Sequence, residues 1–250
     1  MPANNELQRW SPLVLARTSG VLGLIGIAFG AFDIGHIRSA LIVAGNPSLT
    51  VQNILAHETL FRVGFTGHLL EMICNVIAEI IGFYLFWRVN VLVAAIALFC
   101  GFLGIAVESL DMLNSYVPLK LAAEAGAMDA FSPEQLQNLS YFYVQLQDTG
   151  LLISFLFYGL DELLTGYLVF RSRFLPRVLG VLGGIAGFCY ITHTLLFFAA
   201  PALDARMFPY ILYACFPGEA LSSLWLATIG LNVVKWKAWR LEPQTESQTV

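Results

Sequence analysis

The sequence of 250 residues is 58% hydrophobic and only 12% charged, with a formal net charge of −4 and a mean hydropathy of +0.72. A soluble domain carries about twice this fraction of charged side chains, so water is excluded as the main solvent of the chain. The negative balance also excludes a basic surface for nucleic acid. The sequence therefore predicts a multi-pass integral protein of the cell membrane.

Six apolar runs are long enough to cross a bilayer, because a membrane-spanning helix needs about 20 apolar residues. They cover approximately residues 13–32, 64–87, 91–113, 150–170, 178–199 and 210–234. Prolines punctuate them: Pro118 is expected to end the third run, Pro176 precedes the fifth, and Pro209 opens the sixth. The predicted fold is an all-α bundle of about six transmembrane helices, forming one domain over residues 1–250.

Two longer connections are predicted to form short amphipathic helices on the outer side of the membrane. In the first, Asn46-Pro47-Ser48 is a turn pattern, and Ser48 or Thr50 is expected to cap a helix ending near Arg62. In the second, the polar stretch 124–129 is followed by Ser132-Pro133-Glu134-Gln135. This is a capping signature with proline at the first helical position.

Lysine and arginine are unequally distributed between the two sides that six spans define. The side of both termini carries nine: Arg9, Arg17, Arg88, Arg171, Arg173, Arg177, Lys235, Lys237 and Arg240. The other side carries four: Arg38, Arg62, Lys120 and Arg206. The positive-inside rule therefore predicts cytoplasmic termini, with Trp87, Trp236 and Trp239 in an interfacial belt on that side.

Ionisable side chains recur inside the predicted spans, where an aspartate costs roughly 2.5–3.5 kcal/mol and often marks a functional position. Four polar residues share one face of the second span: His68, Glu71, Asn75 and Glu79. In the third span, Glu108 and Asp111 lie above Gly101 and Gly104. The other spans hold Asp33, His36, Asp148, Asp161, Glu162, Tyr190, His193 and Glu219. Most of these positions fall in the outer half of the bilayer, which predicts one polar pocket open to the outside.

The second and third spans are expected to form a single site, since Gly101 and Gly104 allow a close approach of the two helices. Pro217-Gly218, directly before Glu219, predicts a break that aims this carboxylate into the bundle. Nearer the interface, a structural role is favoured for Asp33, His36 and Asp148, which could snorkel or bond a neighbouring helix. Gly180-x-x-x-Gly184 and Gly183-x-x-x-Gly187 indicate close helix packing and weakly indicate a homodimer.

The leading hypothesis is a membrane-embedded enzyme, in the manner of a cyclase, acting on a lipophilic isoprenoid or lipid substrate. Glu79 or Glu162 would be the acid, because burial at mid-membrane favours the protonated carboxyl. His68 would relay protons, whereas Glu71, Glu108 and Asp111 would bind magnesium or zinc or stabilise a developing cation. The catalytic candidates are Glu79, Glu162, Glu71 and His68, and the substrate or metal candidates are Glu108, Asp111, Asn75, Asp161, Glu219 and His193. No nucleotide or flavin is expected.

Two other functions stay open. The same carboxylates would serve a proton- or cation-coupled small-molecule transporter or sensor, since intramembrane acids mark such pathways. A structural or assembly subunit would instead satisfy its carboxylates internally. The expected partners are membrane lipid and a lipophilic small molecule, with no nucleic acid.

Several segments resemble an uncharacterised bacterial membrane family, known as the domain of unknown function 4386 family. They are Gly45-Asn46-Pro47 to Arg62, Phe157-Tyr158-Gly159-Leu160, Gly166-Tyr167-Leu168, and the basic link Arg171-Ser172-Arg173-Phe174-Leu175-Pro176-Arg177 with its continuation to Leu182. Together with Glu219, they extend along most of the chain. The resemblance implies about six spans and no established activity. Where the family has a histidine pattern in its fourth span, this chain has Gln147-Asp148 and Asp161-Glu162, which implies a specialised acid-rich pocket.

Overall fold

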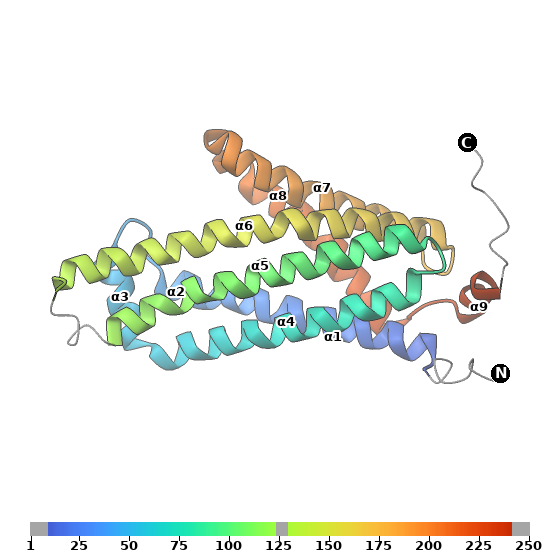
Figure 1. Ribbon diagram of the computed structural model, residues 1–250, viewed down its shortest axis with the longest axis horizontal. Coiled ribbons are helices and arrows are strands. Elements are labelled where there is room, and N and C mark those ends of the chain that lie inside the picture. Colours follow the sequence, from blue (N-terminus) through green and yellow to red (C-terminus); the bar gives the residue numbers. More distant parts are fainter. Residues whose placement is uncertain (1–9, 124–129, 242–250) are drawn as a thin grey trace. The chain divides into compact units, whose positions relative to one another are not determined.

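The computed structural model describes residues 10–123 and 130–241, and these residues are almost entirely helical, with no strand among them (Figure 1). This confirms the predicted all-α class. The polar stretch Glu124–Asp129 of the second predicted connection lies outside the described residues.

The helices follow one another with short links. In chain order they are α1 (Pro12–Phe32), the π-helix η2 (Asp33–Arg38), α2 (Ser39–Leu41), α3 (Pro47–Ala56), α4 (Glu58–Phe86), α5 (Val91–Ala123), α6 (Pro133–Ser172), α7 (Arg177–Ala199), α8 (Pro201–Thr228) and α9 (Val233–Leu241). Among the described residues, five helical segments are long and apolar enough to cross a membrane: Pro12–Leu41, Glu58–Phe86, Val91–Ala123, Pro133–Ser172 and Arg177–Ala199. The helix α8, which contains most of the predicted sixth span, is not one of the five.

The outward faces of these helices are apolar. Leu92 is 67% exposed, Leu110 is 70% exposed and Phe188 is 65% exposed, although all three are large hydrophobic side chains. A soluble protein would bury such residues, whereas lipid is a favourable environment for them. The exposed surface therefore supports a helical membrane bundle.

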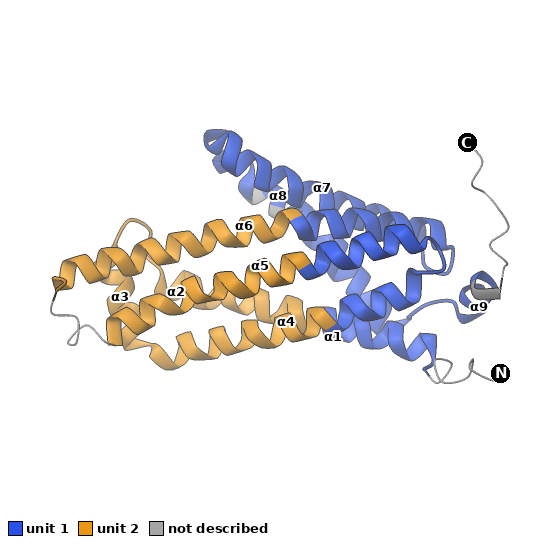
Figure 2. Ribbon diagram, in the orientation of Figure 1, with its two compact units in different colours: residues 1–24, 77–102, 157–250 blue, residues 25–76, 103–156 orange. Residues whose placement is uncertain are grey.

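The chain forms two compact units, coloured separately in Figure 2. Unit 1 comprises residues 1–24, 77–102 and 157–250, and unit 2 comprises residues 25–76 and 103–156. The helices α1, α4, α5 and α6 each contribute to both units. Each carboxylate of the predicted spans lies in one unit or the other.

Three prolines lie inside helices that they were predicted to end, open or break. Pro118 is buried within α5, which continues to Ala123, and Pro209 and Pro217 both lie within α8. In particular, α8 is helical throughout Pro217-Gly218, so the predicted break is wrong. A proline removes one backbone hydrogen bond, and packing against neighbouring helices lets a membrane helix continue through it.

The two predicted outer helices are present with different bounds. The cap of α3 is Asn46, whose side chain accepts a hydrogen bond from the Leu49 amide at 3.0 Å, and neither Ser48 nor Thr50 serves as predicted. The capping signature before α6 is confirmed: the Ser132 amide donates to Gln135 Oε1 at 2.7 Å, and the Gln135 amide donates to Ser132 Oγ at 3.2 Å. The predicted outer helix and the fourth span are one continuous helix of 40 residues.

Candidate functional site

The centre of the candidate site in unit 2 is His68 on α4, whose imidazole lies between two carboxylates. Its Nε2 is 2.9 Å from Glu108 Oε1 on α5, and its Nδ1 is 3.8 Å from Asp33 Oδ2 on η2. The side chains of His68, Glu108 and Asp33 are only 11%, 9% and 17% exposed. We call these three residues the relay triad.

The π-helix η2 contributes Asp33 and Arg38 to this site. A π-helix is wider than an α-helix, is rare, and is frequently found at functional sites. Here it runs from Asp33 to Arg38 and places both charged residues beside one cavity. Arg38 hydrogen-bonds Gln147 and forms an ion pair with Asp148, both on α6.

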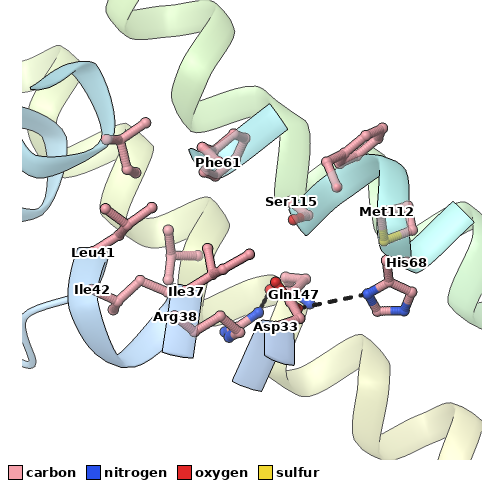
Figure 3. Close-up of a pocket in the computed structure, with 13 residues that line it drawn as sticks. Asp33, Ile37, Arg38, Leu41, Ile42, Phe61, His68, Met112, Ser115 and Gln147 are labelled. Carbon is pink, nitrogen blue, oxygen red and sulfur yellow. Dashed lines mark hydrogen bonds and ion pairs between the residues drawn. The ribbon is translucent and has the colours of Figure 1, made fainter. Parts of the chain in front are cut away.

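The cavity lies beside the relay triad and has a volume of about 30 Å³. Its polar lining comes from Asp33, Arg38, His68, Ser115 and Gln147, as Figure 3 shows, and Phe61 and Met112 are among its apolar lining residues. Since one water needs at least about 10–15 Å³, this space suits about two water molecules. Sequence reasoning missed Arg38 and Gln147 as site residues. No local sequence pattern predicts the π-helix that places Arg38 beside Gln147.

Other predicted residues of unit 2 face different partners. Asp111 accepts a hydrogen bond from Asn114 at 2.8 Å, and its Oδ1 lies only 2.2 Å from where a Cβ on Gly150 of α6 would be. Glu71 and Asn75 instead lie near α1, where an added Cβ on Gly30 or Gly26 would be 3.7 Å from Glu71 Oε1 or 3.4 Å from Asn75 Oδ1. The polar residues predicted on one face of α4 therefore contact two different helices. His68 contacts α5, whereas Glu71 and Asn75 lie beside α1.

The carboxylates of unit 1 form a second group. Glu79 on α4 and Asp161 on α6 lie close together, and Thr165 Oγ1 donates to Asp161 Oδ1 at 3.2 Å. The Glu79 carboxyl occupies the space above Gly101, where an added Cβ would lie 2.6 Å from Glu79 Cδ. Gly101 therefore leaves room for this side chain of α4. A cavity of about 20 Å³ adjoins this pair.

The helices α7 and α8 hold the remaining predicted residues of unit 1. The Tyr190 hydroxyl donates a hydrogen bond to Glu219, so Glu219 faces the bundle as predicted even though α8 is unbroken. Glu162 faces Gly183, with 3.1 Å between its Oε2 and an added Cβ there. His193 Nδ1 is 2.7 Å from Asp204 Oδ1, and both side chains are buried.

Asp204 was missed by sequence reasoning. Its only sequence signal is an acidic residue in the first helical turn after Pro201, where carboxylates are common.

The predicted metal ligands are also distributed differently from the expectation. Within residues 10–123 and 130–241, no three histidine, cysteine, aspartate or glutamate side chains gather closely enough to hold one metal ion.

Comparison with known proteins identifies relatives without an assigned activity. The family model described as "Domain of unknown function (DUF4386)" matches residues 18–230. An "Uncharacterized protein" from Archaeoglobus fulgidus is 32% identical over 96 residues, which are 38% of this chain and 52% of the relative. The match thus spans about half the length of that relative. No solved structure matches the chain at a significant level.

Proposed function

The chain belongs to the family described as Domain of unknown function (DUF4386), and for this member we propose a proton-handling role in the membrane, as a proton- or cation-coupled transporter or sensor. The observation that supports it most is the buried relay triad, in which His68 lies between Glu108 and Asp33.

The chemistry of imidazole suits this role. A histidine ring can accept a proton on one nitrogen and release another from the opposite nitrogen. The 2.9 Å contact with Glu108 is a direct path for a proton. The 3.8 Å between His68 Nδ1 and Asp33 Oδ2 is longer than a hydrogen bond. A water molecule in the adjacent cavity would bridge the two atoms.

An access route towards the exposed surface of unit 2 is also available. Asp148 is 57% exposed, and its ion-pair partner Arg38 lines the cavity together with Asp33 and His68. Protons would enter near Asp148, cross the cavity by water and reach Glu108 through the imidazole. Ionisable chains of this kind mark proton pathways in membrane proteins.

An enzyme acting on an isoprenoid or lipid ranks second in our proposal. It is favoured by the Glu79–Asp161 pair, because two carboxyl groups held close together do not easily both ionise, and the one that keeps its proton could donate it. Small-molecule sites usually measure about 300–1,000 Å³. The cavities beside the two carboxylate groups measure about 30 and 20 Å³, which suits water better than a lipophilic substrate.

We further propose that α8 forms a sixth span, so that the protein lies in the cell membrane with both termini in the cytoplasm. The asymmetry of lysine and arginine supports this orientation. The entry to the relay near Asp148 would then face the outside, and a sensor or transporter would take up protons from there.

The proposal is tested by reconstituting the full chain in liposomes that carry an inside pH dye and applying an acidic outside pulse. His68→Gln removes the titrating ring but keeps an amide of similar polarity, so we expect proton entry to fall at least tenfold. Glu108→Gln should have the same effect, because the neutral amide cannot accept the proton.

His57→Gln is the matched control, since His57 is exposed and its Nδ1 lies 3.1 Å from the carbonyl oxygen of Asn53 in the preceding helix α3. It should conduct like the wild type. Proton entry that is unchanged in both His68→Gln and Glu108→Gln would overturn the relay. A wild-type chain that neither conducts nor changes conformation, as followed by tryptophan fluorescence during the pulse, would overturn the proposed function.

A further inference from the structure

A second feature, in unit 1, combines basic and aromatic side chains at the link between two membrane-spanning helices. Arg88 follows the end of α4, and its guanidinium lies 4.2 Å from the centre of the Trp87 ring. This stacking holds the planar cation in place. The Arg88 Nε is shielded from solvent and has no acceptor in the described part of the chain. An unsatisfied buried donor is unfavourable, and an incoming anion would relieve it.

The helix α9 is fixed beside this link by a tryptophan. Trp236 is buried, and its indole Nε1 donates a 3.1 Å hydrogen bond to the carbonyl of Leu85, one helical turn before Arg88. Its ring lies 6.2 Å from that of Tyr84. Trp236 was predicted to lie in an interfacial belt, and the structure shows it as the side chain that attaches α9 to α4.

This attachment leaves the two lysines of α9 on either side of a buried residue. Lys235 and Lys237 are both exposed, and Asn232 caps the helix by accepting from the Lys235 amide at 3.0 Å. Neither α9 nor the link 87–90 contains an acidic residue. Within the described residues, the ion pairs do not involve Arg88, Lys235 or Lys237.

We infer that Arg88, Lys235 and Lys237 form a binding site for the phosphate of an anionic phospholipid headgroup. Arginine recognises phosphate through its planar set of donors, and the lysines add positive charge. The tryptophans beside them suit the headgroup level of a bilayer, where their apolar bodies meet lipid and their N–H groups meet polar atoms. The link between two spans is where such headgroups lie.

The site is tested by native mass spectrometry of the full chain in a neutral detergent. The probes are short-chain phosphatidylglycerol, phosphatidylcholine with the same acyl chains, and inorganic phosphate. We expect one phosphatidylglycerol to bind in preference to phosphatidylcholine, and inorganic phosphate at equal concentration to leave it bound. Arg88→Gln should weaken phosphatidylglycerol binding about fivefold, and Lys235→Gln with Lys237→Gln should weaken it further, at about 1 kcal/mol per basic residue.

Lys120→Gln is the matched control, because it removes an equally exposed lysine from unit 2. It should bind phosphatidylglycerol like the wild type. Equal binding of phosphatidylglycerol by Arg88→Gln and the wild type would overturn the site. Displacement by inorganic phosphate would show that a free anion, rather than a lipid, is the ligand, and would overturn the lipid assignment. A melting curve of Arg88→Gln that coincides with the wild type confirms that a loss of binding is not a loss of folding.

Discussion

At the scale of single residues, the structure provides a buried polar partner for most of the carboxylates that the sequence places in the membrane. A further buried contact joins His193 to Asp204, a carboxylate that sequence reasoning missed, with side chains 3% and 9% exposed and 2.7 Å between Nδ1 and Oδ1. We expect His193→Leu to destabilise the protein by about 1–3 kcal/mol, because Asp204 would keep its buried oxygens without their donor. Thermal unfolding in detergent measures this loss.

A double variant distinguishes the lost donor from lost packing. Replacing Asp204 with leucine as well removes the group that His193→Leu leaves unsatisfied, so part of the stability should return. If the double variant is less stable than His193→Leu by the full effect of Asp204→Leu, the two side chains do not act as a pair.

At the scale of the helices, α6 and α7 pack through glycines in unit 1. A Cβ on Gly166 would lie 2.7 Å from the carbonyl oxygen of Gly180, and a Cβ on Gly187 would lie 2.5 Å from that of Gly159. Backbone atoms cannot move aside as a flexible side chain can. Gly166→Ala should therefore force the helices apart and cost about 1–3 kcal/mol, as measured by the shift in unfolding temperature.

Gly184→Ala is the control for this prediction. Gly184 belongs to the same glycine pattern, yet an added Cβ there has nothing within 4 Å, so alanine should be tolerated or slightly stabilising. Equal destabilisation by both variants would contradict packing through Gly166. The glycines that indicated a homodimer thus include several that pack within the chain, and the homodimer stays a prediction.

At the scale of the whole molecule, the orientation in the membrane decides which side the proposed proton relay opens to. Helix α6 has 40 residues and is about 60 Å long, roughly twice the thickness of a bilayer core. Its first turns therefore extend well beyond the hydrocarbon on one side. We expect a membrane-impermeant maleimide added to intact cells to label Glu134→Cys and to spare Arg177→Cys, in a chain whose four native cysteines are replaced by alanine. The reverse labelling would place the entry of the relay in the cytoplasm.

Much of this architecture could be predicted from the sequence, because hydropathy and capping are local properties. The membrane class, five of the six predicted long apolar helices and the Ser132–Gln135 cap all follow from residues close together in the chain. The depth of each carboxylate in the membrane was likewise predicted from its position along a helix. These features need no knowledge of which helix lies beside which.

Only the tertiary structure decided which polar side chains meet. The sequence placed Glu71, Glu79 and Glu108 in one site, whereas Glu108 meets His68, Glu71 faces α1, and Glu79 lies beside Asp161. A π-helix places Arg38 beside the cavity of unit 2. The helix α8 continues through Pro217, as a membrane helix can when neighbouring helices pack against it. Such outcomes depend on the rotation and separation of packed helices, which the order of residues along any one helix does not specify.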